Sequence, residues 1–363
     1  MSTVKLSVIY IHYHTEGLLG TSIRHMLASQ FNRELAVEFI IVDNGSSCSL
    51  EKHIPQCNYR LITPGKNLGY AGGINLALTC SDAEYVCVLN PDVYPQPECL
   101  PLLLSEAIAR KGIVGPRMYI DPGCRMLLPC NEERTRQAEF FRTIGTRSSW
   151  LLQHARHRWR HHQRTFMEAR TPVESHDLSG AMLVFSREIY DSVGRFDERF
   201  QLYFEESDWL KRAKSAGAPA FYIPSAVALH LYNQSAVSQK FAQKWMENST
   251  SLFAQLHYGT AFRRLMSFLA KENLEQEKSV HELLDIGELS LRDLSQHHFP
   301  VSVELAAYPD GFPGLIEIVG YGDRDYWVFS ADAWETLATG HYIVQVVSWS
   351  GKELRRSKVA RNV

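Results

Sequence analysis

The feature that most constrains the fold is a series of short apolar runs, rich in β-branched residues, near the start of the chain. They span residues 6–11, 38–42 and 85–89, and segments with helical patterning at 18–30 and 71–79 lie between them. Strands that are apolar along their whole length are buried on both faces, as in a parallel sheet covered by helices. We therefore predict an α/β nucleotide-binding domain with a mainly parallel central sheet.

Polar side chains follow two of these apolar runs. Asp43 ends the second run and begins Asp-Asn-Gly-Ser-Ser, and Asn90-Pro91-Asp92 follows the third. Ligands of open α/β sheets bind at the carboxyl ends of the strands, so both groups lie where a site is expected. A carboxylate such as Asp92 suits Mg²⁺ or Mn²⁺, which take oxygen ligands. Taken singly, the Asp43 group is better explained as an Asp-Asn-Gly turn, whereas for Asn90-Pro91-Asp92 a turn and a metal site have equal weight.

A glycine-rich stretch at residues 66–75 opens the second helical segment. Its glycines could let backbone N–H groups and the positive end of the helix dipole meet a diphosphate. The spacing matches neither a Walker loop nor GxGxxG. The alternative is that these glycines serve only the packing of helix against strand.

An acidic group lies between aromatic and apolar residues at positions 203–210. Glu205 and Glu206 are flanked there by Phe204 on one side and by Trp209 on the other. Carboxylates in apolar surroundings have raised pKa values, which suits a general base. A solvated helix start is the alternative for the group, and Asp208 fits that alternative best.

The middle of the chain is strongly basic. Residues 125–170 hold ten arginines against four glutamates, and residues 142–170 interleave arginine and histidine with Trp150 and Trp159. Tryptophan beside arginine suits a membrane interface or a lipid-linked acceptor. A solvated basic helix is the competing interpretation. If lipid is the partner, changing Arg156, Arg158 and Arg160 to Glu should weaken binding to anionic vesicles.

The patterning divides the chain into three parts. Residues 1–237 form the α/β domain with the basic insertion at about 125–172, residues 238–284 a helical linker, and residues 285–363 a small β-sandwich-like domain with period-two alternation. Four aromatic residues of the last part could form a sugar-stacking face, although a sandwich core is the preferred interpretation: Trp327, Trp334, Tyr342 and Trp349.

Seven motifs in order closely resemble those of family 2 glycosyltransferases of the rhamnosyltransferase-like kind. They begin with the Asp43 turn, the stretch from Asn67 to Asn75 and the Asn90 turn, and continue with Ser179-Gly180-Ala181-Met182, Gly194-Arg195-Phe196-Asp197-Glu198-Arg199-Phe200, Tyr203-Phe204-Glu205-Glu206-Ser207-Asp208 and His230. The resemblance covers residues 5–235. It implies a GT-A fold, a nucleotide-diphosphate sugar donor, a divalent ion and inversion at the anomeric carbon.

The resemblance also assigns roles to individual residues. Glu206 stands where the family has its base, with Glu205 as the first member of the acidic pair. Asp92 and His230 would hold Mg²⁺ or Mn²⁺. The expected donor-binding residues are His12, Asp43, Asn67, Gly72, Gly73, Asn75 and Asn90. His12 occupies a position where the family commonly has Thr, which leaves the nucleoside open.

The expected activity is therefore metal-dependent inverting transfer of a hexosyl group from dTDP-rhamnose or a UDP-sugar to a surface glycan or a lipid-linked saccharide. A non-catalytic glycan-binding protein and a sugar nucleotidyltransferase are the alternatives, but the latter should carry a glycine-rich loop after the first strand, where this chain has Ile11-His12-Tyr13. The net charge of −2 does not favour nucleic-acid binding. Without an evident signal peptide or spanning segment, we expect a cytoplasmic protein, peripheral on the inner face of the membrane if the basic segment binds lipid.

Overall fold

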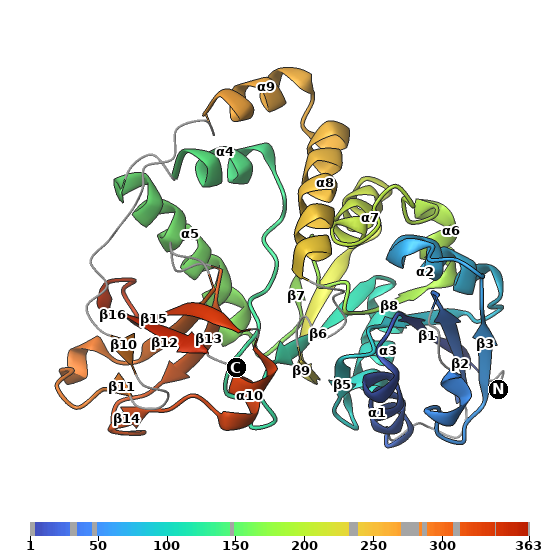
Figure 1. Ribbon diagram of the computed structural model, residues 1–363, viewed down its shortest axis with the longest axis horizontal. Helices are drawn as coiled ribbons and strands as arrows, with labels where there is room; N and C mark the ends of the chain where they lie inside the picture. The colour runs from blue at the N-terminus through green and yellow to red at the C-terminus, as the bar shows by residue number, and fades with distance from the viewer. Residues whose placement is uncertain are drawn as a thin grey trace. The chain divides into compact units, whose positions relative to one another are not determined.

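The computed structural model describes residues 4–29, 35–45, 49–145, 149–231, 239–269, 283–284, 289–307, 313–337 and 339–361. The chain forms two compact units, each built from separate stretches of sequence (Figure 1). The first unit consists of Met1–Arg117, Asn131–Arg136 and Glu168–Arg264. The second consists of Met118–Cys130, Gln137–Met167 and Leu265–Val363.

Four parallel strands make up one half of the sheet in the first unit. In sheet order they are β3 (Tyr59–Ile62), β2 (Leu35–Asp43), β1 (Val4–His12) and β4 (Tyr85–Leu89). Val8, Ile9, Ile40 and Ile41 are completely buried, which shows that neighbouring positions of one strand are covered on both faces. The predicted α/β class and its parallel strands are confirmed.

The other half of this sheet is mixed. Its strands are β8 (Met182–Ser186), β6 (Ile113–Tyr119), β9 (Ala220–His230), β5 (Val93–Pro95) and β7 (Val173–Glu174). Strand β8 is antiparallel to β4, and β5 is antiparallel to β9 with Val93 opposite His230. This last pairing brings the end of β9 beside the turn that follows β4, so it positions two of the predicted site residues.

Helices α1 (Glu16–Leu27), α2 (Gly69–Thr79), α3 (Cys99–Arg110), α6 (Arg187–Val193), α7 (Glu205–Ser215) and α8 (Gln239–His257) belong to the first unit, and α9 (Thr260–Leu269) begins in it. The segment predicted to be a linker contains α8, which packs within this unit. Phe253 of α8 lies in one apolar cluster with Phe200 and Phe204, and the Ser249 hydroxyl donates to the Leu202 carbonyl at 2.8 Å.

The second unit contains the predicted C-terminal β region. Its five-stranded sheet has the order β10 (Leu283–Leu284), β16 (Glu353–Arg361), β15 (Gly340–Ser348), β12 (Val301–Ala306) and β13 (Leu315–Val319). A small sheet of β11 (Leu289–Ser290) and β14 (Tyr326–Trp327) and the helix α10 (Ala331–Thr336) complete it. Trp327, Trp334 and Tyr342 lie in its hydrophobic core, as preferred over a sugar-stacking face.

The basic segment differs most from its prediction. It forms α4 (Arg136–Gly145) and α5 (Ser149–Glu168), and residues 137–167 group with the β region and not with the α/β domain. Arg156 and Arg160 of α5 are 3% and 7% exposed. The Arg160 guanidinium binds the Glu304 carboxylate of β12 through two contacts of 2.9 Å. These two arginines therefore cannot bind lipid, because they are inside the second unit.

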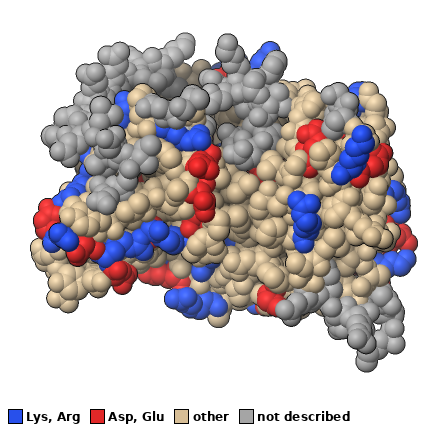
Figure 2. Space-filling model, turned by 60° about the horizontal axis from the view of Figure 1, so that its bottom comes forward, with Lys and Arg blue, Asp and Glu red and all other residues tan. Residues whose placement is uncertain are grey.

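On the face of the molecule drawn in Figure 2, Lys and Arg side chains are interspersed with Asp and Glu, and the described residues show no continuous basic area there. Across the described ranges, no helix combines the length and the apolar character that crossing a bilayer requires.

Candidate functional site

The carboxyl ends of β1 and β2 bring His12 and Asp43 together as register partners. His12 is fully buried, and its Nδ1 lies 2.9 Å from the Thr15 hydroxyl. Its Nε2 lies 3.7 Å from a Glu16 carboxylate oxygen and has no hydrogen-bond partner among the described residues. Burial lowers the pKa of His12 and so favours a neutral imidazole beside Asp43, which is 6% exposed.

Asn67, predicted to bind the donor, connects two loops of the protein. Its side-chain oxygen accepts from the Asn44 amide at 3.0 Å and from the Gly69 backbone N–H at 2.8 Å. The Asn44 side-chain oxygen accepts from the Leu68 N–H at 2.7 Å. Asn44 therefore holds the glycine-rich loop against the end of β2, a role that the sequence pattern did not reveal.

The first amides of α2 are used within the protein. Besides Leu68 and Gly69, the Tyr70 N–H donates to the Gln201 carbonyl at 3.0 Å. A Cβ atom on Gly73 would lie 2.8 Å from Cγ2 of Ile11, and one on Gly72 would lie 2.9 Å from a side chain of the preceding turn. These glycines are therefore closely packed, which is the use that the alternative interpretation gave them, and their donor-binding role stays a prediction.

Asn75 is also engaged by the protein itself. Its side-chain oxygen accepts from the Phe196 N–H at 3.0 Å and the Tyr190 hydroxyl at 3.1 Å. Its amide nitrogen donates to the Phe196 carbonyl and to Glu198, both at 2.9 Å. These four bonds use the whole capacity of a fully buried side chain, so Asn75 ties α2 to the 190–198 segment.

Three of the predicted site residues carry groups that could bind a metal ion. Asn90 and Asp92 follow β4, and His230 ends β9. Asp92 is 1% exposed, and its Oδ1 lies 3.6 Å from Nε2 of His230 at the end of β9. The buried Oδ1 of Asn90 has no hydrogen-bond partner among the described residues. The described residues contain no group of three His, Cys, Asp or Glu able to hold a metal. One carboxylate, one imidazole and one unused amide oxygen nevertheless fit a divalent ion.

The acidic pair begins α7 after a strained stretch of backbone. Tyr203 and Phe204 both have left-handed conformations, with φ of 69° and 72°. Left-handed backbone is costly for large side chains and persists where the surroundings enforce it, often at functional sites. Glu205 is 4% exposed, and its Oε2 has no hydrogen-bond partner in the described part of the chain. Glu206 lies against Gly180, where a Cβ would approach its side chain to 3.0 Å.

Electrostatics distinguish the two glutamates and group them with the strand-end carboxylate. Burial and the neighbouring charge of Glu206 raise the pKa of Glu205 well above its usual range. Burial raises the pKa of Glu206 as well, but the Arg134 guanidinium opposes that effect. Burial and the charges of Glu205, Glu206 and Asp92 raise the pKa of Tyr70. The sequence analysis did not assign this phenol, whose hydroxyl donates to the Gly180 carbonyl at 3.2 Å.

Asp177 is a further buried acid that the sequence analysis missed. Its Oδ1 accepts from the Asn131 amide at 3.2 Å and from the Ser207 hydroxyl at 3.1 Å. Burial raises its pKa to about 7, with Glu206 adding to the effect and Arg134 opposing it. No motif marked Asp177, and Arg134 lies in the segment that was interpreted as a basic insertion.

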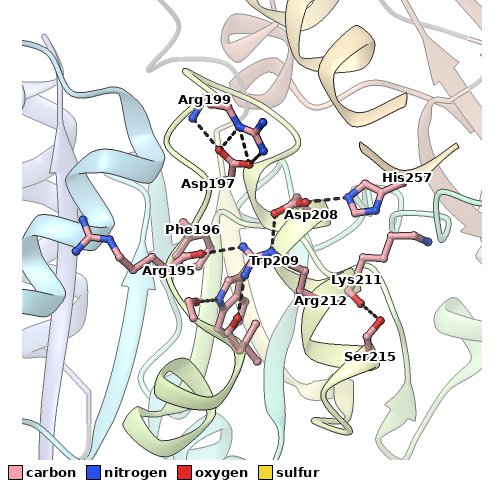
Figure 3. Close-up of polar contacts among 12 residues, drawn as sticks. Arg195, Phe196, Asp197, Arg199, Asp208, Trp209, Lys211, Arg212, Ser215 and His257 are labelled. Atoms are coloured by element: carbon pink, nitrogen blue, oxygen red, sulfur yellow. Dashed lines mark hydrogen bonds and ion pairs between the residues drawn. The ribbon is translucent and has the colours of Figure 1, made fainter. Parts of the chain in front are cut away.

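Asp208 has a structural role on α7. Figure 3 shows its carboxylate between Arg212, at 2.9 Å, and His257 of α8, at 2.8 Å. The Arg212 guanidinium also donates to the backbone carbonyls of Val193 and Arg195. Asp208 thus joins α7, α8 and the 193–199 segment. It lies at the helix start, but it is buried and paired, whereas the alternative interpretation expected it to be solvated.

Comparison with known proteins identifies sequence relatives of this chain. The model of the family described as "Glycosyl transferase family 2" matches residues 7–194, more than half of the chain. The low-salt glycan biosynthesis hexosyltransferase Agl10 of Haloferax volcanii is 28% identical over 221 residues, 58% of this chain and 61% of that protein. The match therefore spans less than two thirds of Agl10.

A second relative is the N-acetylglucosaminyl-diphospho-decaprenol L-rhamnosyltransferase of Mycobacterium tuberculosis. It is 29% identical over 230 residues, which are 58% of this chain and 72% of the relative. Among solved structures, S. aureus TarS 1-349 in complex with UDP aligns with a TM-score of 0.44 at 14% identity, over 69% of this chain and 66% of that one. The mannosyltransferase PcManGT of Pyrobaculum calidifontis, in complex with GDP-Man and Mn2+, aligns with a TM-score of 0.45 at 14% identity, over 73% and 68%.

Proposed function

The chain belongs to glycosyl transferase family 2, and from this premise we propose that it moves a hexosyl group from a nucleotide-diphosphate sugar to a hydroxyl of a glycan or lipid-linked saccharide, with inversion. The observation that carries the proposal is the acidic start of α7. Two glutamates, Glu205 buried and Glu206 partly exposed, follow a strained turn there. Gly180 packs against Glu206, and the carbonyl of the next residue, Ala181, accepts at 2.8 Å from the Asn90 N–H of the turn that carries Asp92. Inverting transfer needs a base for the acceptor hydroxyl and, close to it, a carboxylate on the side of the departing diphosphate.

Glu206 is the better candidate for the base. It is partly exposed, whereas Glu205 is buried, and only an accessible carboxylate can reach an acceptor hydroxyl. Arg134 also favours the ionised form of Glu206, while the pKa of Glu205 is raised further. The Glu206 carboxylate takes the proton of the hydroxyl as its oxygen attacks the anomeric carbon. Attack from the face opposite the leaving diphosphate inverts that carbon.

Asp92 and His230, with the unused amide oxygen of Asn90, would hold Mg²⁺ or Mn²⁺. Such an ion supplies positive charge to a departing diphosphate. The protein itself orients these ligands through the β5–β9 pairing, which places Val93 opposite His230. His12 and Asp43 would contact the nucleoside of dTDP-rhamnose or a UDP-sugar from the ends of β1 and β2.

The base assignment is tested by matched variants. Glu206→Gln keeps size and shape but cannot take a proton, so transfer should fall by about 100-fold or more with donor affinity unchanged. A screen of UDP-, dTDP- and GDP-sugars with Mg²⁺ or Mn²⁺ supplies the substrate. If Glu205→Gln abolishes transfer and Glu206→Gln does not, Glu205 is the base. If neither variant slows transfer, the site is elsewhere.

The metal assignment has its own test. Asp92→Ala should remove most transfer, and EDTA should reproduce that loss in the wild type, since both would take away the charge that stabilises the leaving diphosphate. Asp82→Ala is the control because Asp82 is an exposed carboxylate paired with Lys5 at 2.8 Å. Full activity of Asp92→Ala, or of wild type in EDTA, would contradict the assignment.

A lipid-linked acceptor would bring the protein to a membrane surface, and the exposed Trp150 of α5 is the residue that we propose for this contact. It is 71% exposed, whereas Arg156 and Arg160 are buried. Indole side chains prefer the interface between water and lipid. Trp150→Ala should weaken sedimentation with anionic vesicles, with neutral vesicles as the comparison. Unchanged sedimentation would leave α5 without a membrane role.

A further inference from the structure

A short segment of the chain, Asn131–Arg136, returns to the first unit although the stretches on either side of it group with the second. Several contacts anchor it to the first unit, and two of them are to α7. The carboxylate of Glu133 binds the Lys214 ammonium at 3.0 Å, and the Arg134 carbonyl accepts from the Lys211 ammonium at 3.3 Å. Asn131 donates to Asp177 at 3.2 Å. The segment is therefore held on the helix that carries the acidic pair.

Arg134 places a cation at the start of that helix. Its guanidinium carbon lies 3.9 Å from the ring centroid of Phe204, the residue that precedes Glu205 and Glu206. A guanidinium stacked so closely on an aromatic face is fixed in position and partly desolvated. Its Nε is buried and has no hydrogen-bond partner within the described residues. The positive charge of Arg134 is thus held beside the acidic pair. Among the described residues, no recorded ion pair joins Arg134 to a carboxylate.

We propose that Arg134 is a positioning residue that keeps the Glu206 carboxylate ionised, a role that rests on the proposed function of Glu206 as the base. Among the described residues, the acids that interact electrostatically with Glu206 are Glu205 on its own helix, Tyr70 on α2 and Asp177 before β8. Arg134 is the cation that acts on Glu206 against these acids, and Lys211 is a second cation further along α7.

The sign of the effect follows from these charges. Burial favours the protonated form of Glu206, and the guanidinium favours the ionised form. Burial raises the pKa of Asp177 to about 7, so in acidic solution this group is neutral and does not offset Arg134. Removing the cation should raise the pKa of Glu206. The acidic limb of the pH-rate profile, where the base becomes ionised, then moves to higher pH.

Three variants test the proposal by the pH dependence of kcat/KM. Arg134→Met removes the charge and should move the acidic limb upward by about one pH unit, a tenfold loss of rate on that limb. Arg134→Lys restores a cation and should return the limb toward the wild-type position. Lys214→Gln is the control, because it removes a cation that contacts the same segment at Glu133 but not the acidic pair. An unmoved limb in Arg134→Met would overturn the proposal.

A second measurement does not depend on activity. The side-chain carboxyl ¹³C signal of Glu206, assigned by its loss in Glu206→Gln, should titrate at higher pH in Arg134→Met than in wild type. If wild type transfers no sugar but this signal still moves, the proposed function fails and the electrostatic role of Arg134 stands. If the wild type is active and the signal does not move, the role of Arg134 is refuted. Arg134→Gln serves if Arg134→Met does not fold.

Discussion

The buried acid Asp177 contributes to the pH dependence of the stability of the first unit, and Asp177→Asn should remove this contribution. Asn can keep both hydrogen bonds of Oδ1, which accepts from Asn131 at 3.2 Å and from Ser207 at 3.1 Å. Its amide group would replace Oδ2, whose recorded partner is the same Ser207 hydroxyl at 3.2 Å. The substitution therefore removes a titrating group with little change of shape.

The magnitude follows from the pKa. In the folded protein burial raises the pKa of Asp177 from its usual 3.8 to about 7. Between these values the unfolded chain has released the proton and the folded chain still holds it, so the free energy of unfolding falls as the pH rises. At about 1.4 kcal/mol for each pH unit, the loss is at most about 4 kcal/mol by pH 7 and constant above it. Because Asp177→Asn has no titrating carboxyl at this position, its free energy of unfolding should not include this loss.

Urea unfolding of both proteins at pH 4.5, 6 and 8 measures the effect. The free energy of unfolding of the variant minus that of wild type should increase by about 1 to 4 kcal/mol from the lowest to the highest pH. Asp191→Asn, at an exposed position of the same unit, is the control and should show no such gain. A difference between Asp177→Asn and wild type that is the same at every pH would refute the reasoning.

Two further predictions concern packing and a buried charge. Gly73→Ala should lower the free energy of unfolding by about 1 to 3 kcal/mol, because the new methyl would lie 2.8 Å from Ile11, whereas Gly17→Ala, with nothing within 4 Å, should not; chemical denaturation compares them. Glu304→Gln should cost about 3 to 5 kcal/mol in the second unit because it leaves Arg160 buried without its carboxylate. An unfolding midpoint equal to that of wild type would contradict either prediction.

The local sequence pattern was enough to predict the sheet and the polar residues at the ends of its strands. Continuous apolar runs such as residues 85–89 require burial on both faces, and a parallel strand within helical layers supplies it. Asp43 and Asp92 were placed correctly at strand ends for the same reason, since a strand that is apolar throughout ends where polar residues begin. These features depend on neighbours in sequence, so the sequence contains them.

The partners of the charged residues were decided only by the tertiary structure. Arg160 appeared to be one of many solvated or lipid-facing arginines, yet it is buried because Glu304, far along the chain, lies opposite it. Arg134 lies beside the acidic pair because its segment belongs to the first unit, although the sequence on either side of that segment belongs to the second unit. A charge can be buried only where an opposite charge, a hydrogen-bonding group or an aromatic face compensates for lost water, and these come from distant segments. Local periodicity therefore determined the framework of this protein, and long-range compensation determined which of its charges surround the site.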